Sequence, residues 1–89
     1  MLKYFVEFVG TMFLSFIVLA TGNWMAIASA LALCALLGGP ISGGAFNPAV
    51  AIGMMSAGKL SRGDVIPYIV AEVAGALAAV QLVKMVIKK

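Results

Sequence analysis

The sequence predicts an all-α membrane protein with three transmembrane helices and one shorter, re-entrant half-helix. Of its 89 residues, 64% are hydrophobic and 10% are charged, whereas soluble domains average roughly 45–50% apolar and about 25% charged residues. The few charges leave apolar runs long enough to cross the ~30 Å hydrocarbon core as helices. A glycine-rich stretch at residues 42–47, too irregular for a span, separates the second run from a short apolar segment.

Composition excludes several classes of function. The chain has no His and only three acids, Glu7, Asp64 and Glu72, so it lacks the nucleophile and base pairs or the metal-ligand sets of enzymes. We therefore expect no enzymatic activity, no metal site and no cofactor. The basic residues are dispersed, which argues against a nucleic-acid partner and favours contact with the headgroups of a lipid bilayer.

The first predicted span covers about residues 4–21, with Lys3 before it and a Gly-Asn turn after it. Its start is also compatible with a signal peptide, but Glu7 and the bulky residues near its end favour a retained helix. The last predicted span covers about residues 65–87. The residues expected to mediate helix packing are small ones in these two spans: Gly10, Ala71, Gly75 and Ala79.

The second predicted span covers about residues 24–41 and begins at Trp24, a residue type common at membrane interfaces. We expect its regular helix to stop at the Gly-Gly-Pro tripeptide at 38–40. A helix from Trp24 to Leu37 rises only about 21 Å, which is short of the hydrocarbon thickness.

Residues 42–57 are predicted to form a re-entrant loop and a half-helix. Asn47 suits an N-cap, and Pro48 suits the first helical position, where its missing N–H costs nothing. The ten residues from Pro48 to Ala57 make about 15 Å of helix, half the hydrocarbon thickness. Irregular backbone at that depth is tolerated only inside protein or beside a wet cavity, so this segment predicts a pore or a packed partner.

The motif Ser42-Gly43-Gly44 followed by Asn47-Pro48-Ala49-Val50 resembles the first half of the aquaporin and aquaglyceroporin, or major intrinsic protein, family. The stretch from Glu7 to Thr11 is similar to that family's first-helix motif, and the third-helix motif is matched by Tyr68, Ala71, Gly75 and Ala76. The resemblance covers residues 1–89 as a single half-repeat. Because family members usually contain two inverted halves, it implies an aquaporin-like fold completed by an inverted second copy.

That resemblance implies a passive channel for water, for small neutral solutes such as glycerol, or for both. The expected partners are a second, inverted copy of the chain, four such dimers making eight chains, and the lipid bilayer. The residues expected to line the pore or to select solutes are Asn47, Pro48, Ala49, Val50 and Ile27, and the loop expected to line the lumen through its carbonyls comprises Ser42, Gly43, Gly44, Ala45 and Phe46.

The same resemblance implies structural roles for two acidic residues. Glu7 matches the family's buried glutamate, which hydrogen-bonds the re-entrant loop, and an acid inside a span needs a partner. Glu72 stands where the family usually has Gln. It is expected either to brace the loop as a protonated acid or to pair with a basic residue.

Three positions depart from the family pattern. Val50 stands where the second half usually has Arg, Ala45 where His is often found, and Ile27 where water-selective members often carry an aromatic residue. Both mouths of the pore would then be aliphatic, which predicts a wider and less polar constriction that admits glycerol-sized solutes.

The basic residues divide evenly between the two membrane sides, with Lys3, Lys59 and Arg62 on one side and Lys84, Lys88 and Lys89 on the other. Because orientation follows the Lys and Arg bias, both orientations are expected, as an inverted homodimer requires. The alternative is a non-conducting membrane interaction protein, or a truncated relic, that packs with full-length relatives.

Overall fold

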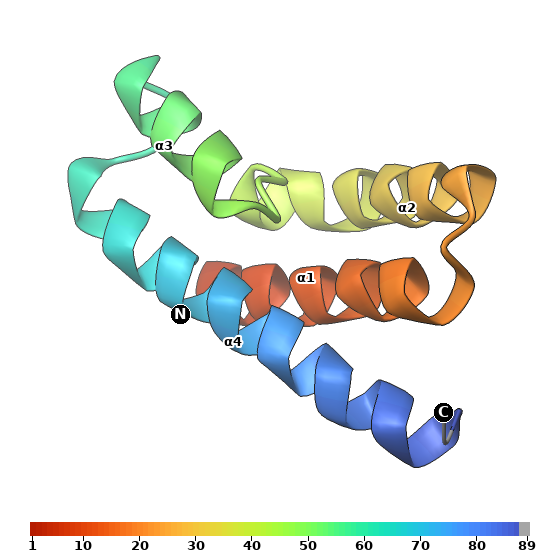
Figure 1. Cartoon of the computed structure of the whole chain (residues 1–89). Coiled ribbons are helices and arrows are strands. Elements are labelled where there is room, and N and C mark those ends of the chain that lie inside the picture. The colour runs from red at the N-terminus through yellow and green to blue at the C-terminus, as the bar shows by residue number, and fades with distance from the viewer. Residues whose placement is uncertain (88–89) are drawn as a thin grey trace.

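The computed structural model describes residues 1–87, and within that range it contains four helices and no strands (Figure 1). They are α1 (Leu2–Thr21), α2 (Trp24–Ser42), α3 (Pro48–Ser56) and α4 (Arg62–Val86). All but α3 are long and apolar enough to cross a membrane, whereas the 9 residues of α3 rise only about 14 Å. The predicted fold class, three spans and a half-helix, is confirmed. Lys88 and Lys89 of the charge comparison lie outside the described residues.

Helix α1 lies at the centre of the arrangement. It packs against α2 on one side and against α4 on the other, while α3 packs only against α4 (Figure 1). A tight turn makes α2 antiparallel to α1: Gly22 adopts the left-handed conformation (φ 56°), and the Asn23 side chain caps α2 by accepting from the N–H groups of Met25 and Ala26. The turn thereby supplies hydrogen-bond partners to the backbone at the end of α1 and at the start of α2.

Helices α1 and α4 run in the same direction and approach closely. At their starts, Lys3 Nζ lies 2.8 Å from Asp64 Oδ2. Further along, a Cβ placed on Gly75 would lie 2.5 Å from the Phe8 carbonyl oxygen. Gly75 and Ala79 are buried, and Ala71 is half-buried. The small residues of α4 therefore permit the backbones to meet, as the spacing predicts.

The predicted end of α2 at residues 38–40 is wrong, because the helix continues through Pro40 to Ser42. A proline so near a helix end removes only one backbone donor, and the helix stops where the chain reverses its handedness. That position is Gly43, with φ 88° and an N–H that donates to the Gly39 carbonyl. The full 19 residues of α2 rise about 28 Å, close to the hydrocarbon thickness.

Helix α4 begins at Arg62, earlier than the predicted span at 65, and ends at Val86. Ser61 occupies the N-cap position in an extended conformation, and the Asp64 N–H donates to its carbonyl at 3.0 Å. The early start places Asp64 in the first turn, where a carboxylate is favourable and where it reaches both Lys3 and Tyr4 of α1. This polar contact fixes the register of α1 against α4.

Candidate functional site

The tip of α3 is built by Asn47 and Pro48. The Asn47 side-chain oxygen accepts from the Ala49 N–H at 2.8 Å, and its backbone carbonyl accepts from the Ala51 N–H at 2.9 Å. Because capping occupies the oxygen, the side-chain amide of Asn47 presents its N–H₂ group outward. Within residues 1–87 that group has no hydrogen-bond partner, and the side chain is exposed. A donor thus lies at the positive end of a helix dipole.

The loop that precedes the tip has an unusual backbone. Gly43, Gly44 and Phe46 all have positive φ angles, of 88°, 75° and 52°. Glycine adopts this conformation freely, whereas an L side chain there costs roughly 1–2 kcal/mol. Phe46 therefore needs compensating contacts, which come from α1 and α2.

Glu7 of α1 supplies the first of these contacts. It is 0% exposed, and its two carboxylate oxygens accept from the Ser42 hydroxyl at 2.6 Å and from the Phe46 N–H at 2.8 Å. The Tyr68 hydroxyl of α4 donates to the Ser42 carbonyl at 2.7 Å. The end of α2 and the approach to α3 are thus held from two other helices, as buried polar groups in a membrane require.

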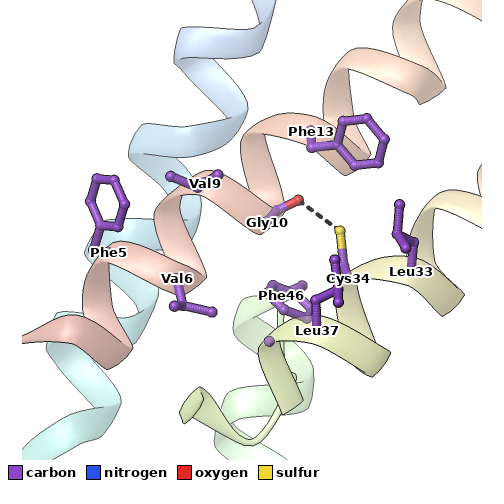
Figure 2. A pocket seen from close by; sticks show the side chains of 10 residues that line it. Phe5, Val6, Val9, Gly10, Phe13, Leu33, Cys34, Leu37 and Phe46 are labelled. Carbon is purple, nitrogen blue, oxygen red and sulfur yellow. Dashed lines mark hydrogen bonds between the residues drawn. The ribbon is translucent and has the colours of Figure 1, made fainter. Parts of the chain in front are cut away.

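The Phe46 ring supplies the second contact. It is 3% exposed and lies between Gly10 of α1 and Gly38 of α2, so that a Cβ on Gly38 would be 2.8 Å from the ring and one on Gly10 closer still. Figure 2 shows the ring beside Gly10, whose carbonyl accepts a hydrogen bond from the Cys34 thiol at 3.6 Å. Gly10 therefore makes room for an aromatic side chain rather than for another helix backbone.

An apolar groove of about 330 Å³ lies between α1 and α2, and Figure 2 shows the side chains that line it, among them Phe46. Cys34 of α2 also lines the groove and is buried. The groove holds no charged side chain.

The structure brings together some of the residues predicted to line a pore and separates others. Asn47, Ala49 and Val50 are exposed at the tip, with Pro48 half-buried between them. Ile27 is half-buried near the opposite end of α2, about 22 Å along the helix from Ser42. The tip and Ile27 therefore belong to different depths of the membrane.

Within the predicted lining loop, Ser42, Ala45 and Phe46 are buried in their own chain, Gly44 is half-buried and Gly43 is exposed. The backbone groups of the same loop are only partly hydrogen-bonded. The N–H groups of Gly44 and Phe46 are bonded to Ser42 and Glu7, while the carbonyls of residues 43–46 accept no hydrogen bond within residues 1–87. The loop can offer acceptors only through these carbonyls.

A second groove, of about 360 Å³, lies beside the tip between α1 and α4. Its polar lining residues are Thr11, Ser15, Asn47 and Glu72. Glu72 is 1% exposed, and neither its carboxylate oxygens nor the Thr11 hydroxyl has a hydrogen-bond partner among the described residues. Thr11 has no predicted role, and Tyr68 is named only as part of the third-helix motif. In both cases the sequence signal that could have identified a functional residue is a polar side chain inside an apolar span.

Comparisons with known proteins place this geometry in a family. The family model described as Major intrinsic protein matches residues 1–89. A glycerol uptake facilitator protein-like 6 of Lactiplantibacillus plantarum is 40% identical over 93 aligned positions, covering 94% of this chain and 43% of the relative. Aquaporin Z of Brucella melitensis is 52% identical over 48 positions, covering 54% of this chain and 21% of the relative.

Aquaglyceroporin AqpS of Rhizobium meliloti is 40% identical over 60 positions, covering 67% of this chain and 26% of the relative. The chain thus spans less than half the length of these curated relatives. No solved structure matches the chain significantly. The family's aquaporins and glycerol facilitators are channels and not enzymes, in agreement with the sequence expectation. The chain belongs to the major intrinsic protein family and is a multi-pass integral membrane protein.

Proposed function

We propose that this chain forms half of a passive channel for water or small neutral solutes such as glycerol, and that an inverted copy supplies the other half. One observation carries the proposal. The tip of α3 presents the Asn47 amide donor beside a loop whose carbonyls, at residues 43–46, have no partner within the described chain. The Asn47 donor and the Gly43 carbonyl both belong to exposed residues, so a donor and an acceptor are offered near each other on the surface of a membrane protein.

The exposed tip requires either water or protein against it. Ala49, Val50 and Ile52 form an uncovered face of α3, and the irregular loop beside them lies between spans. An unsatisfied backbone group in hydrocarbon costs several kcal/mol, so such a loop is stable only at a wet cavity or a protein interface. An inverted second copy provides both, since a two-fold axis in the membrane plane brings two tips together.

The paired tips explain why neutral solutes would pass and cations would not. Each helix N-terminus carries an equivalent of roughly +0.5 charge, so two of them repel cations at the middle of the pore. A water molecule or an alcohol turns its oxygen to the Asn47 donors and its hydrogen to the loop carbonyls. Val50 and Ile27 add only aliphatic surface, which favours a constriction wide enough for glycerol.

The placement of basic residues supports insertion in both orientations. Lys59 and Arg62 lie near the end of the molecule at which Lys3 contacts Asp64, whereas Lys84 lies in the last turn of α4, at the other end. With Lys88 and Lys89, which follow Lys84 in the sequence, three basic residues stand against three, so no excess of Lys and Arg would direct insertion strongly. An assembly of four dimers, eight chains in all, extends the same proposal.

Flux measurements test it. Vesicles that contain the purified chain are expected to shrink faster in a hyperosmotic solution than empty vesicles, and to admit glycerol. Asn47→Asp is the matched variant, because it keeps the capping oxygen and a favourable charge at the helix start but loses both N–H donors. We expect it to fold normally and to lose neutral-solute flux.

Two outcomes would contradict the proposal. Flux no greater than that of empty vesicles would favour the non-conducting interaction protein, and wild-type flux through the Asn47→Asp variant would show that Asn47 does not line the path.

A further inference from the structure

We propose that Glu72 is protonated and donates a hydrogen bond to the Glu7 carboxylate, so that a carboxylic acid and carboxylate pair positions the re-entrant loop. Glu72 is then a positioning residue, which acts on the tip of α3 through Glu7. The proposal concerns the folded chain, and only its effect on flux rests on the proposed function.

The hydrogen bonds of the two acids differ. Glu7 is fully buried, and both of its oxygens already accept from donors on Ser42 and Phe46. Glu72 is equally buried, and neither of its oxygens meets a donor within residues 1–87. An ionised carboxylate can only accept hydrogen bonds, whereas a protonated one can also donate. The arrangement suits Glu7 to be the ionised partner and Glu72 to be the neutral one.

The packing of α1 against α4 places Glu7 and Glu72 at the same height along the two helices. Lys3 contacts Asp64 near the start of both helices, and Gly75 lies against Phe8 and Met12 further along. Glu72 lies one turn before Gly75, and Glu7 lies next to Phe8, so the two acids stand at the same level of the contact between α1 and α4. The Glu7 side chain and the Asn47 backbone lie near Glu72, and neither forms a hydrogen bond of good geometry with its carboxyl oxygens.

The described chain offers no cation to balance two buried charges. On α1, Lys3 and Tyr4 are bonded to Asp64 at the start of the helix. On α4, the other titratable group facing the pair is the Tyr68 hydroxyl, which donates to Ser42. Helix α3, between Pro48 and Ser56, has no titratable side chain.

The remaining basic side chains of residues 1–87 are exposed: Lys59, Arg62 and Lys84. Two carboxylates that share a buried site without a cation cannot both be ionised, so one of them keeps its proton. This excludes the alternative that Glu72 pairs with a basic residue of the described chain.

Removal of the proton would act on the loop. Two neighbouring carboxylates repel each other, and the bonds of Lys3 and Tyr4 to Asp64 oppose the separation of α1 from α4. The movement therefore falls on Glu7, which releases the Phe46 N–H. Phe46 then loses a restraint on its left-handed backbone, and the tip of α3 shifts. Rising pH is expected to close the path.

Infrared spectroscopy of the purified chain tests the pair without any measurement of transport. We expect a carboxylic acid C=O band at neutral pH that disappears in the Glu72→Gln variant. No such band in the wild type, or the same band in Glu72→Gln, would overturn the proposal.

Flux against pH tests the consequence in vesicles. Wild-type flux is expected to fall to the level of empty vesicles between neutral and strongly alkaline buffer. Glu72→Gln, whose amide is a neutral donor of the same shape, is expected to keep its flux across that range, whereas Glu72→Leu, which has no donor, loses it at every pH. Lys84→Gln removes an exposed charge from the same helix and is expected to keep the wild-type pH profile.

The two proposals fail differently. The infrared band with no flux at any pH would defeat the channel and leave the acid pair standing. Flux that is independent of pH in the wild type, without the band, would defeat the pair and leave the channel standing.

Discussion

At the scale of single residues, the distance between two helices depends on one missing methyl group. Gly75 touches the backbone of α1, where a Cβ would lie 2.5 Å from the Phe8 oxygen and 3.0 Å from the Met12 nitrogen. Backbone atoms cannot rotate away as a side chain can. Gly63, at the start of the same helix, has nothing within 4 Å of its would-be Cβ, so the two glycines form a natural pair for comparison.

Gly75→Ala is expected to destabilise the protein, because the added methyl group must push α1 away from α4. Overpacking of this kind costs roughly 1–3 kcal/mol. The matched control, Gly63→Ala, is expected to be neutral or stabilising by up to about 1 kcal/mol, since alanine favours helix. Thermal unfolding in detergent, followed by circular dichroism, measures both; equal midpoints would contradict the close contact.

Val50 tests the wall of the proposed path. It is 46% exposed in the first turn of α3, where a long cationic side chain would project beside the tip. We expect Val50→Arg to reduce glycerol flux more strongly than water flux, because it narrows an aliphatic constriction. Val86→Arg, at the far end of α4, serves as the control and should leave the ratio of the two fluxes unchanged.

Should Val50→Arg leave both fluxes unchanged as well, Val50 would not line the path, and the wall would have to be formed by other residues.

At the scale of elements, the loop before α3 is held by an aromatic wedge. The Phe46 ring fills the space that Gly10 and Gly38 leave between α1 and α2. Its N–H is bonded to Glu7 of α1. A short half-helix with few contacts of its own thus receives its position from two full spans, and its cap at Asn47 fixes only its first turn.

A double-mutant cycle is expected to reveal this wedge. Gly10→Ala should destabilise the protein by displacing the ring, and Phe46→Ala should destabilise it by about 3–5 kcal/mol through the cavity it leaves. In the double variant the new methyl group occupies part of the vacated space. The combined loss of unfolding free energy should therefore be smaller than the sum of the single losses. Additive losses would show that the ring and Gly10 do not share this space.

At the scale of the whole molecule, α1 packs against both of the other long helices, and much apolar surface remains exposed. Helix α2 is buried only along the stripe of Ala30, Cys34, Gly38 and Ser42, and large side chains elsewhere on it are exposed, among them Leu36 at 71%. In a membrane these faces meet lipid or another copy of the chain. The described chain by itself encloses no path, which is why the proposed function requires a second copy.

Insertion in both orientations is expected from the balance of basic residues. A reporter active only in the cytoplasm and one active only in the periplasm, each fused to the C-terminus, should both give signal. The double substitution Lys59→Gln and Arg62→Gln removes two charges from one side and should silence one reporter, because orientation follows the Lys and Arg bias. A wild-type chain that activates a single reporter would contradict dual topology.

Neighbouring residues do not determine a helix end that depends on contacts with other helices. The tripeptide at 38–40 carries the usual stop signals, yet α2 continues to Ser42, whose hydroxyl and carbonyl are held by Glu7 and Tyr68. Likewise Phe46 is expected to line the lumen only through its carbonyl, and the burial of its ring between α1 and α2 is visible only in the structure. In both cases partners distant in sequence outweigh the preference of the nearby residues.

What the sequence by itself determined is the class of protein and the local conformation of its motif. Apolar length predicts the three spans, and Asn47 followed by Pro48 predicts the start of a half-helix, because span length and capping depend only on neighbouring residues. Only the tertiary structure decided that the loop group bonded by Glu7 is the Phe46 N–H, that the helix met by Gly75 is α1, and that Glu72 is buried without a hydrogen-bond partner among the described residues. These contacts join different helices, and their geometry exists only once the helices have packed.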